Sequence, residues 1–303
     1  MASLPLSPEE LDLKELGDRA AGRGIAIRPL TAGIGAEIRG LDLENPLSPE
    51  DWGILRAAWL RWKVVLIRDT DISHEAHIRL GRLFGELEGH PVIPHVPGHP
   101  EILSIRGVEG VKPTPETIEG FRAYNKWHTD VTFRQKPSIA SLLRARLLPP
   151  VGGDTLFADT AAAWRGLPDA VKERIETLDA EHDIVRSFGG RVTEERREQL
   201  RRDFPAVRHP VVRRHPETGE KILYVNYTFT SRILDIDPSE SEQLLRLLFD
   251  RIKVPEYQVR LSWTPNAIAI WDNRSTQHYA VGDYFPADRV LERVTVSGDV
   301  VSR

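Results

Sequence analysis

Two histidines and one aspartate carry the strongest chemical signal in this sequence. His128 and Asp130 are separated by one residue in the segment WHTDVTF, in a β-rich part of the chain. On a strand, alternate side chains share a face, so this spacing would point both groups at one ion. Neutral imidazole with carboxylate is a ligand pair expected for iron or a similar metal. Two His-x-Glu segments, 99–101 and 215–217, are each centred on proline, and we interpret them as turns.

A third histidine, His278, completes a potential metal triad. It lies far along the chain from the first pair, just after the apolar segment 267–271, which predicts a buried strand. Two histidines and one carboxylate on one side of a metal leave other coordination positions open, as in non-haem Fe(II) oxygenases. We therefore predict a metal centre of His128, Asp130 and His278. A zinc hydrolase with the same ligands, and a binding protein with a structural metal, are the alternatives.

Two arginines near the end of the chain are candidate anion-binding groups. Arg289 and Arg293 would share a face if they lie on one strand. A guanidinium grips a carboxylate or a sulfate through two parallel hydrogen bonds. A cosubstrate with a 2-oxo acid head and a distal carboxylate would need one such group. The arginines of segment 193–202, in contrast, are expected on a solvated helix surface.

The elements that must position these side chains are predominantly strands. Helices are predicted over 48–62, 73–84, 168–178, 193–202 and 238–251, after a short helical preamble within 1–22. The segment 214–225, RHPETGEKILYV, has turn residues between two β-rich arms and predicts a hairpin. Strands are predicted within the segments 24–30, 36–43, 64–67, 101–107, 138–148, 154–160, 209–215, 221–229, 257–263, 267–271 and 290–298. We therefore expect a mainly β fold with flanking helices.

The composition excludes several classes of protein. The chain has 303 residues with 40% hydrophobic and 28% charged residues, as in ordinary globular domains. It has no cysteine, which excludes disulfides, thiolate metal sites and cysteine nucleophiles. A net charge of −4 argues against nucleic acid, and no apolar run is long enough for a membrane span. The start lacks a secretory leader, so the cytoplasm is the default location.

The chain shows no clear internal boundary. We predict an N-terminal extension over 1–22 and a single domain over 23–303. The segment 107–126 lacks periodicity and directly precedes the histidine–aspartate pair. We interpret it as a candidate active-site lid, because structureless loops of this length are usually functional or disordered.

Four motifs, in the same order along the chain, resemble the taurine dioxygenase family of Fe(II)/2-oxoglutarate oxygenases. They are WHTDVTF, GGDTLFADT, LYVNYTFTSRILD and IWDNRSTQHYAVGDYFPADRVLERVTVSGD, and the similarity runs from about residue 24 to 299. The resemblance implies a double-stranded β-helix, or jelly-roll, core. It also implies iron bound by His128, Asp130 and His278, and the distal carboxylate of 2-oxoglutarate held by Thr155 and Arg289.

The resemblance also suggests how a substrate is bound. Arg293 would face the anionic group of the primary substrate, and His90 would contact the substrate. Val131 and Phe229 would be apolar pocket residues. In the same picture Asp272 and Asn273 support the iron site without binding the metal. The tryptophans, such as Trp59, Trp62 and Trp263, are expected in the core.

Two positions depart from the taurine enzymes. Ile93 stands where they have tyrosine, and Tyr124 stands where they have asparagine. Isoleucine offers no hydrogen bond to a buried ammonium group, so a larger and more apolar pocket follows. We expect an alkyl sulfate ester or a sulfonate, hydroxylated next to the heteroatom to give an aldehyde plus sulfate or sulfite, with succinate and CO2. A carboxylate substrate such as an aryloxyacetate is the alternative. The expected partners are the organic anion and dioxygen, with the chain in a homo-oligomer (dimer or tetramer).

Overall fold

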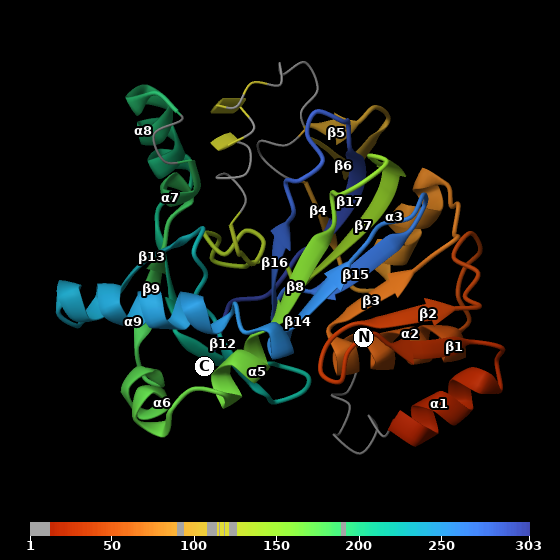
Figure 1. Ribbon diagram of the computed structural model, residues 1–303, viewed down its shortest axis with the longest axis horizontal. Helices are drawn as coiled ribbons and strands as arrows, with labels where there is room; N and C mark the ends of the chain where they lie inside the picture. Colours follow the sequence, from red (N-terminus) through yellow and green to blue (C-terminus); the bar gives the residue numbers. More distant parts are fainter. Residues whose placement is uncertain are drawn as a thin grey trace.

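The strands form one large sheet and three small ones. The computed structural model describes residues 13–89, 94–107, 114, 116–117, 119–120, 126–188 and 192–303. A nine-stranded sheet, the major sheet, has the order β1-β2-β3-β15-β7-β17-β6-β5, with β4 paired to β17 (Figure 1). Its strands are β1 Ala26–Pro29, β2 Ala36–Arg39, β3 Val64–Ile67, β4 Leu87–Glu88, β5 His95–Val96, β6 His99–Arg106, β7 Ala140–Leu147, β15 Ile268–Asp272 and β17 Val290–Val296.

A three-stranded sheet of order β14-β8-β16, the minor sheet, packs against the major one through a shared apolar cluster. The remaining sheets are β10-β9-β13 and the hairpin β11-β12. Their strands are β8 Thr155–Asp159, β9 Asp179–His182, β10 Val207–Pro210, β11 Val212–Arg214, β12 Lys221–Leu223, β13 Thr230–Ile233, β14 Gln258–Leu261 and β16 Thr276–Ala280. The mainly β prediction is therefore confirmed, and so is the hairpin.

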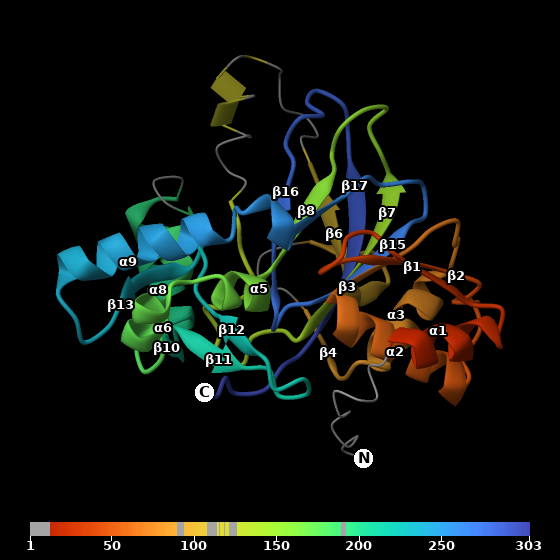
Figure 2. The same cartoon turned by 60° about the horizontal axis from the view of Figure 1, so that its bottom comes forward.

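The helices gather at two ends of the molecule. In both views α1, α2 and α3 lie beside β1–β3, whereas α6, α8 and α9 lie at the opposite end (Figures 1 and 2). The helices are α1 Leu13–Ala21, α2 Pro49–Trp62, α3 His74–Arg82, α5 Thr160–Arg165, α6 Asp169–Ile175, α7 Ile184–Phe188, α8 Glu194–Asp203 and α9 Pro238–Arg251. Over the described ranges, no helix is both long and apolar enough to cross a membrane.

Local capping explains why the predicted helices begin where they do. The Ser48 side chain accepts a hydrogen bond from the backbone N–H of Asp51 at the start of α2, and Ser73 does the same for Ala76 in α3. Such caps satisfy N–H groups that have no partner inside the helix. Helix α2 ends at Trp62, and the next residue, Lys63, caps it in the left-handed conformation with φ 64°. The chain then enters β3 directly.

The major sheet is buried on both faces. Val65 and Ile67 pack with α1–α3 in one apolar cluster, whereas Val64 and Leu66 pack in another with Phe157 of the minor sheet. Alternate residues of a strand point to opposite faces, so every second side chain of these strands points between the two sheets. This inner space is where the candidate site lies. The jelly-roll core expected from the resemblance has this two-sheet construction.

Several elements differ from the sequence prediction. The predicted strand 221–229 ends at Leu223, and the segment around His278, for which no element was predicted, forms the strand β16. The helices α5 and α7 were not predicted. The 215–217 segment lies in the hairpin turn as expected, but 99–101 begins β6, so its interpretation as a turn was wrong.

Candidate functional site

The structure brings the three predicted metal ligands together. One ligand atom from each of His128, Asp130 and His278 lies within 4.8 Å of the others, and no other such group occurs over the described ranges. The Nε2 atoms of both histidines are 3.9 Å from the same Asp130 oxygen, Oδ1. The Asp130 side chain is 6% exposed but that of His128 is 27% exposed, so the group can be reached from outside. This arrangement can hold a metal through two nitrogens and one oxygen.

A long-range backbone pairing joins the two histidines. His128 and His278 form an isolated antiparallel bridge, in which each N–H donates to the carbonyl of the other, at 3.1 and 2.8 Å. The predicted strand over His128 and Asp130 is wrong, because the chain turns at once. Val131 has φ 47°, and Arg134 N donates to its carbonyl. Asp130 therefore meets His128 through a turn, not through the alternation of a strand.

A chain of hydrogen bonds fixes the carboxylate of Asp130. Its Oδ2 accepts from Ser141 Oγ at 2.9 Å. Ser141 Oγ accepts from Asn273 Nδ2 at 2.9 Å, and Asn273 Oδ1 accepts from Trp271 Nε1 at 2.7 Å. Every donor in this chain points toward the carboxylate, so each bond holds the next. The expected supporting role of Asn273 has this physical basis.

Asp272 supports the site in a different way. It accepts from His215 Nε2 at 2.8 Å and from both Nε and Nη2 of Arg274, at 2.9 and 2.7 Å. Arg274 also donates to Glu217. Because Asp272 and Arg274 are buried, this ion network fixes the turn that leads from β15 into β16. That turn precedes the strand of His278.

The charge state of the triad suits metal binding. Burial by itself would raise the pKa of Asp130, but the nearby Arg293 guanidinium and the two histidines lower it well below its usual range. Burial, with the neighbouring His128, lowers the pKa of His278 to about 3, and burial lowers that of His128 as well. At neutral pH the triad therefore consists of two neutral imidazoles and one carboxylate. These are the protonation states that a metal requires of its ligands.

The two histidines are oriented by different means. The Lys126 carbonyl lies 2.8 Å from Nδ1 of His128, which fixes the ring and leaves Nε2 free as a ligand. Nδ1 of His278 is buried without a hydrogen-bond partner among the described residues. Its ring instead packs against Trp271 and Phe157, with centroids 5.0 and 5.9 Å away.

Arg289 lies in a second, adjacent part of the site. It directly precedes β17, is 5% exposed, and its Nη2 donates to Thr155 Oγ1 at 3.4 Å. Trp263 Nε1 donates to the same hydroxyl at 3.1 Å, so the hydroxyl keeps its own hydrogen for an acceptor. Nε of Arg289 is buried and has no partner among the described residues. These unpaired donors fit a carboxylate.

Two features of this part were not foreseen from the sequence. Arg289 lies between the rings of Trp263 and Tyr284, with its Cζ 6.0 and 5.6 Å from their centroids. Trp59 and Trp62 are core residues as predicted, but Trp263 is only partly buried and takes part in the site. Gly153 in the GGDT motif has φ 75°, and a Cβ there would lie 3.1 Å from Arg289 Cδ. The glycine therefore leaves room for the arginine.

Arg293, the second candidate anion-binding arginine, lies next to the metal ligands. It lies on the inner face of β17, is 6% exposed, and its Nη1 donates to Asp130 Oδ1 at 2.9 Å. Its Nε is also buried without a partner in the described chain. Val131 and Phe229 are buried in one apolar cluster beside the metal group, and the Phe229 ring lies 6.4 Å from that of His128.

Some predicted residues lie outside the described part of the chain. These are the candidate substrate contacts His90, Ile93 and Tyr124, together with most of the candidate lid 107–126. Their roles stay predictions, as does the division into an extension over 1–22 and one domain over 23–303. Helix α1 contributes Leu16 and Ala20 to the apolar cluster beneath the major sheet.

Comparison with known proteins identifies the class. Residues 26–295 match the model of the taurine catabolism dioxygenase TauD, TfdA family. An alkylsulfatase of Acinetobacter baylyi is 36% identical over 286 residues, covering 92% of this chain and 86% of the relative. An alpha-ketoglutarate-dependent sulfate ester dioxygenase of Pseudomonas putida is 35% identical, with 90% of each chain covered. The crystal structure of a taurine dioxygenase from Burkholderia xenovorans is 39% identical, with a TM-score of 0.77 and 91% and 90% coverage.

The fold and site thus define a jelly-roll dioxygenase with a two-histidine, one-carboxylate metal group. The chain belongs to the taurine catabolism dioxygenase TauD, TfdA family. It is a non-haem iron dioxygenase that uses 2-oxoglutarate. The donor set and the unpaired guanidinium nitrogens fit Fe(II) and a dicarboxylate cosubstrate. The zinc hydrolase and the non-catalytic binding protein are therefore not supported.

Proposed function

We propose that this enzyme hydroxylates the carbon next to the heteroatom of an alkyl sulfate ester or a sulfonate. The product collapses to an aldehyde with release of sulfate from an ester, or of sulfite from a sulfonate. One dioxygen is consumed, and 2-oxoglutarate is converted to succinate and CO2. The observation that carries the proposal is Arg293, a buried guanidinium beside Asp130 with an unpaired Nε.

The metal would be held by His128, Asp130 and His278. When bound, Fe(II) supplies with dioxygen and 2-oxoglutarate the oxidising power that breaks a C–H bond. The remaining chemistry of the protein is positioning. Ser141 and the Lys126 carbonyl hold two of the ligands in place, and the neighbouring apolar side chains exclude water.

The two arginines would divide the anions between them. Arg289 and the Thr155 hydroxyl would hold the distal carboxylate of 2-oxoglutarate, because both have hydrogen-bond donors left over. Arg293 would hold the sulfate or sulfonate group close to the metal. The carbon beside that group then faces the reacting position, and Val131 and Phe229 contact the organic part.

Two observations favour a sulfate ester over taurine. The matched relatives named above include an alkylsulfatase and a sulfate ester dioxygenase. The side chains beside the triad that we assign to the substrate, Val131 and Phe229, carry no group that could pair with the ammonium of taurine. An aryloxyacetate, with a carboxylate in place of the sulfate, is the second candidate, since Arg293 would hold that group equally well. A cytoplasmic location and a homo-oligomeric state stay predictions.

A substrate panel tests the proposal. The enzyme is incubated with Fe(II), 2-oxoglutarate and dioxygen, and succinate is measured with each of hexyl sulfate, hexanesulfonate, taurine and 2,4-dichlorophenoxyacetate. We expect the highest kcat/KM with hexyl sulfate, together with stoichiometric sulfate and aldehyde. Faster turnover of the aryloxyacetate would replace the sulfate ester by the second candidate, and activity without dioxygen would contradict both.

Arg293→Gln tests whether Arg293 binds the substrate anion while Arg289 binds 2-oxoglutarate. It should raise the KM for hexyl sulfate by roughly tenfold or more, since a charge-assisted bond is lost. The KM for 2-oxoglutarate should change little. If only the KM for 2-oxoglutarate rose, the roles given to Arg289 and Arg293 would be wrong.

A further inference from the structure

A cavity lies on the outer side of β16, the strand that carries His278. It has a volume of about 300 Å³. Gln277 and Tyr279 line it, whereas His278 between them points to the inner face of the same strand, because neighbouring side chains of a strand alternate. Trp127, which precedes His128, lines it as well. The cavity is thus a second site, separate from the one described above.

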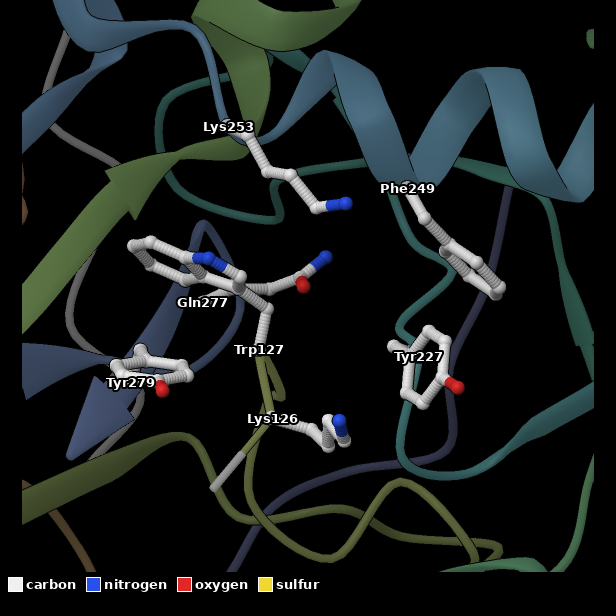
Figure 3. Close-up of a pocket in the computed structure, with 7 residues that line it drawn as sticks. All are labelled: Lys126, Trp127, Tyr227, Phe249, Lys253, Gln277 and Tyr279. Carbon is white, nitrogen blue, oxygen red and sulfur yellow. The ribbon is translucent and has the colours of Figure 1, made fainter. Parts of the chain in front are cut away.

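Two aromatic pairs form opposite walls of this cavity. Trp127 packs on Tyr279 with ring centroids 5.8 Å apart, and Tyr227 packs on Phe249 with centroids 5.6 Å apart. Figure 3 shows the first pair on one side of the open space and the second pair on the other. Tyr227 is 46% exposed, so part of its side chain is open to a ligand. A space between aromatic side chains suits a flat ring.

The cavity carries positive charge without a matching negative charge in its lining. Lys126 and Lys253 line it, and none of the lining residues is acidic. Lys253 pairs with Asp250 at 2.6 Å on the surface. The ammonium of Lys126 lies 5.5 Å from the Tyr227 ring centroid and pairs with no carboxylate among the described residues. Figure 3 shows the two lysine side chains reaching the open space from opposite sides.

The base of the cavity is polar. Gln277 is 1% exposed, and its Nε2 donates to the Val225 carbonyl at 2.7 Å, which fixes the amide. A buried amide between aromatic walls, with ammonium groups at the rim, is typical of a small-molecule site: mostly apolar, with a few fixed polar groups.

We propose that this cavity binds a flat aromatic carboxylate. The ring would lie between the Trp127 wall and the Tyr227 wall, and the carboxylate would pair with Lys126, with Lys253 contributing at longer range. Aromatic stacking supplies the contact area and the lysines supply selectivity for an anion. The site is independent of the substrate proposed above.

Calorimetric titration of 2-naphthoate tests the proposal. The enzyme is first loaded with Co(II) and 2-oxoglutarate without dioxygen, so that the inner cosubstrate site is filled. We expect one naphthoate per chain. Its Kd should rise at least fivefold in Lys126→Gln and in Tyr227→Ala, two exposed positions where folding is not at stake. The neutral analogue 2-naphthylmethanol and the non-aromatic cyclohexanecarboxylate should each bind at least fivefold more weakly.

Two control variants separate this site from others. Lys172→Gln removes a surface lysine with an i,i+3 aspartate partner, as Lys253 has, and should leave the Kd unchanged. Arg293→Gln removes an anion group of the inner site and should also leave it unchanged. The proposal is overturned if naphthoate shows no saturable binding, or if Arg293→Gln abolishes the binding. It is also overturned if the Kd is unchanged in both Lys126→Gln and Tyr227→Ala, or if the neutral analogue binds as tightly as naphthoate.

Discussion

Two of the predicted metal ligands, Asp130 and His278, are supported in opposite ways. Asp130 receives hydrogen bonds from Ser141 on β7 and from Arg293 on β17, both strands of the major sheet. His278 lies on the minor sheet, and its Nδ1 atom has no hydrogen-bond partner in the described chain. It is held by the rings of Trp271 and Phe157 and by its backbone bridge.

The difference follows from the chemistry of the two groups. A buried carboxylate keeps its charge only if donors or positive charges surround it, because burial alone disfavours the charged form. A neutral imidazole carries no charge, so burial disfavours it less than a carboxylate, and ring packing can orient it. The carboxylate is therefore held by polar groups of the major sheet, whereas the imidazole is held by rings from both sheets, Trp271 of β15 and Phe157 of β8.

The largest effect is expected from removing either ligand. Asp130→Ala and His278→Ala should each weaken Co(II) binding by more than about 100-fold, beyond the loss that outer partners usually cause. Calorimetric titration without dioxygen measures this. His99→Ala is a matched control, since its side chain is 23% exposed and is not part of the triad. Normal metal binding in either ligand variant contradicts the assignment of the metal centre.

The next largest effect should come from the two residues that we assign to 2-oxoglutarate, Arg289 and Thr155. Arg289→Ala should raise the KM for 2-oxoglutarate by roughly 10- to 100-fold, because hydrogen bonds to a charged group are lost. Thr155→Val, which removes only the hydroxyl, should have a smaller effect in the same direction. Co(II) affinity without 2-oxoglutarate should change little in both. A KM near the wild-type value in Arg289→Ala would show that another group holds the carboxylate.

A third variant examines the support of Asp130 directly. Ser141→Ala breaks the hydrogen-bond chain from Trp271 and should weaken Co(II) binding by about tenfold. Ser275→Ala is the matched control, because Ser275 is buried but its hydroxyl has no partner among the described residues. Equal Co(II) affinity in the two variants would mean that Arg293 alone suffices to hold the carboxylate.

The smallest expected effect concerns His77, which packs on the outer face of β7, the strand that carries Ser141. His77 on α3 is fully buried against β7, 3.1 Å from the Leu142 carbonyl, and burial lowers its pKa to about 3. The unfolded chain binds a proton at about pH 6.5 and the native chain does not, so stability falls as the pH drops below that value. Between pH 8 and pH 6 this loss is about 0.8 kcal/mol.

His77→Gln should remove that contribution. The difference in the free energy of unfolding between pH 8 and pH 6, measured by urea denaturation, should shrink by about 0.8 kcal/mol. Because His182 and His209 are unchanged in both proteins, their contributions cancel. An unchanged difference would show that His77 gains its proton in the native protein as readily as in the unfolded one.

Local signals in the sequence predicted many elements correctly. The α2 helix starts after Ser48 and ends at Trp62 as predicted, because its cap and its apolar spacing are local properties. The strand β3 coincides with the apolar run 64–67. The strand β16 was missed because its residues, TQHYA, are largely polar. It is a strand because it pairs with β8, a partner distant in sequence.

By itself the sequence determined the kinds of groups available: two imidazoles, one carboxylate and two guanidinium groups within motifs typical of one family. Only the tertiary structure decided how they meet. The bridge between His128 and His278, the turn at Val131 and the stacking of Trp263 on Arg289 all join segments that are far apart or locally ambiguous. Periodicity in the sequence predicts only on which face of its own helix or strand a side chain lies. Which elements face one another is decided when the two sheets close around a common interior.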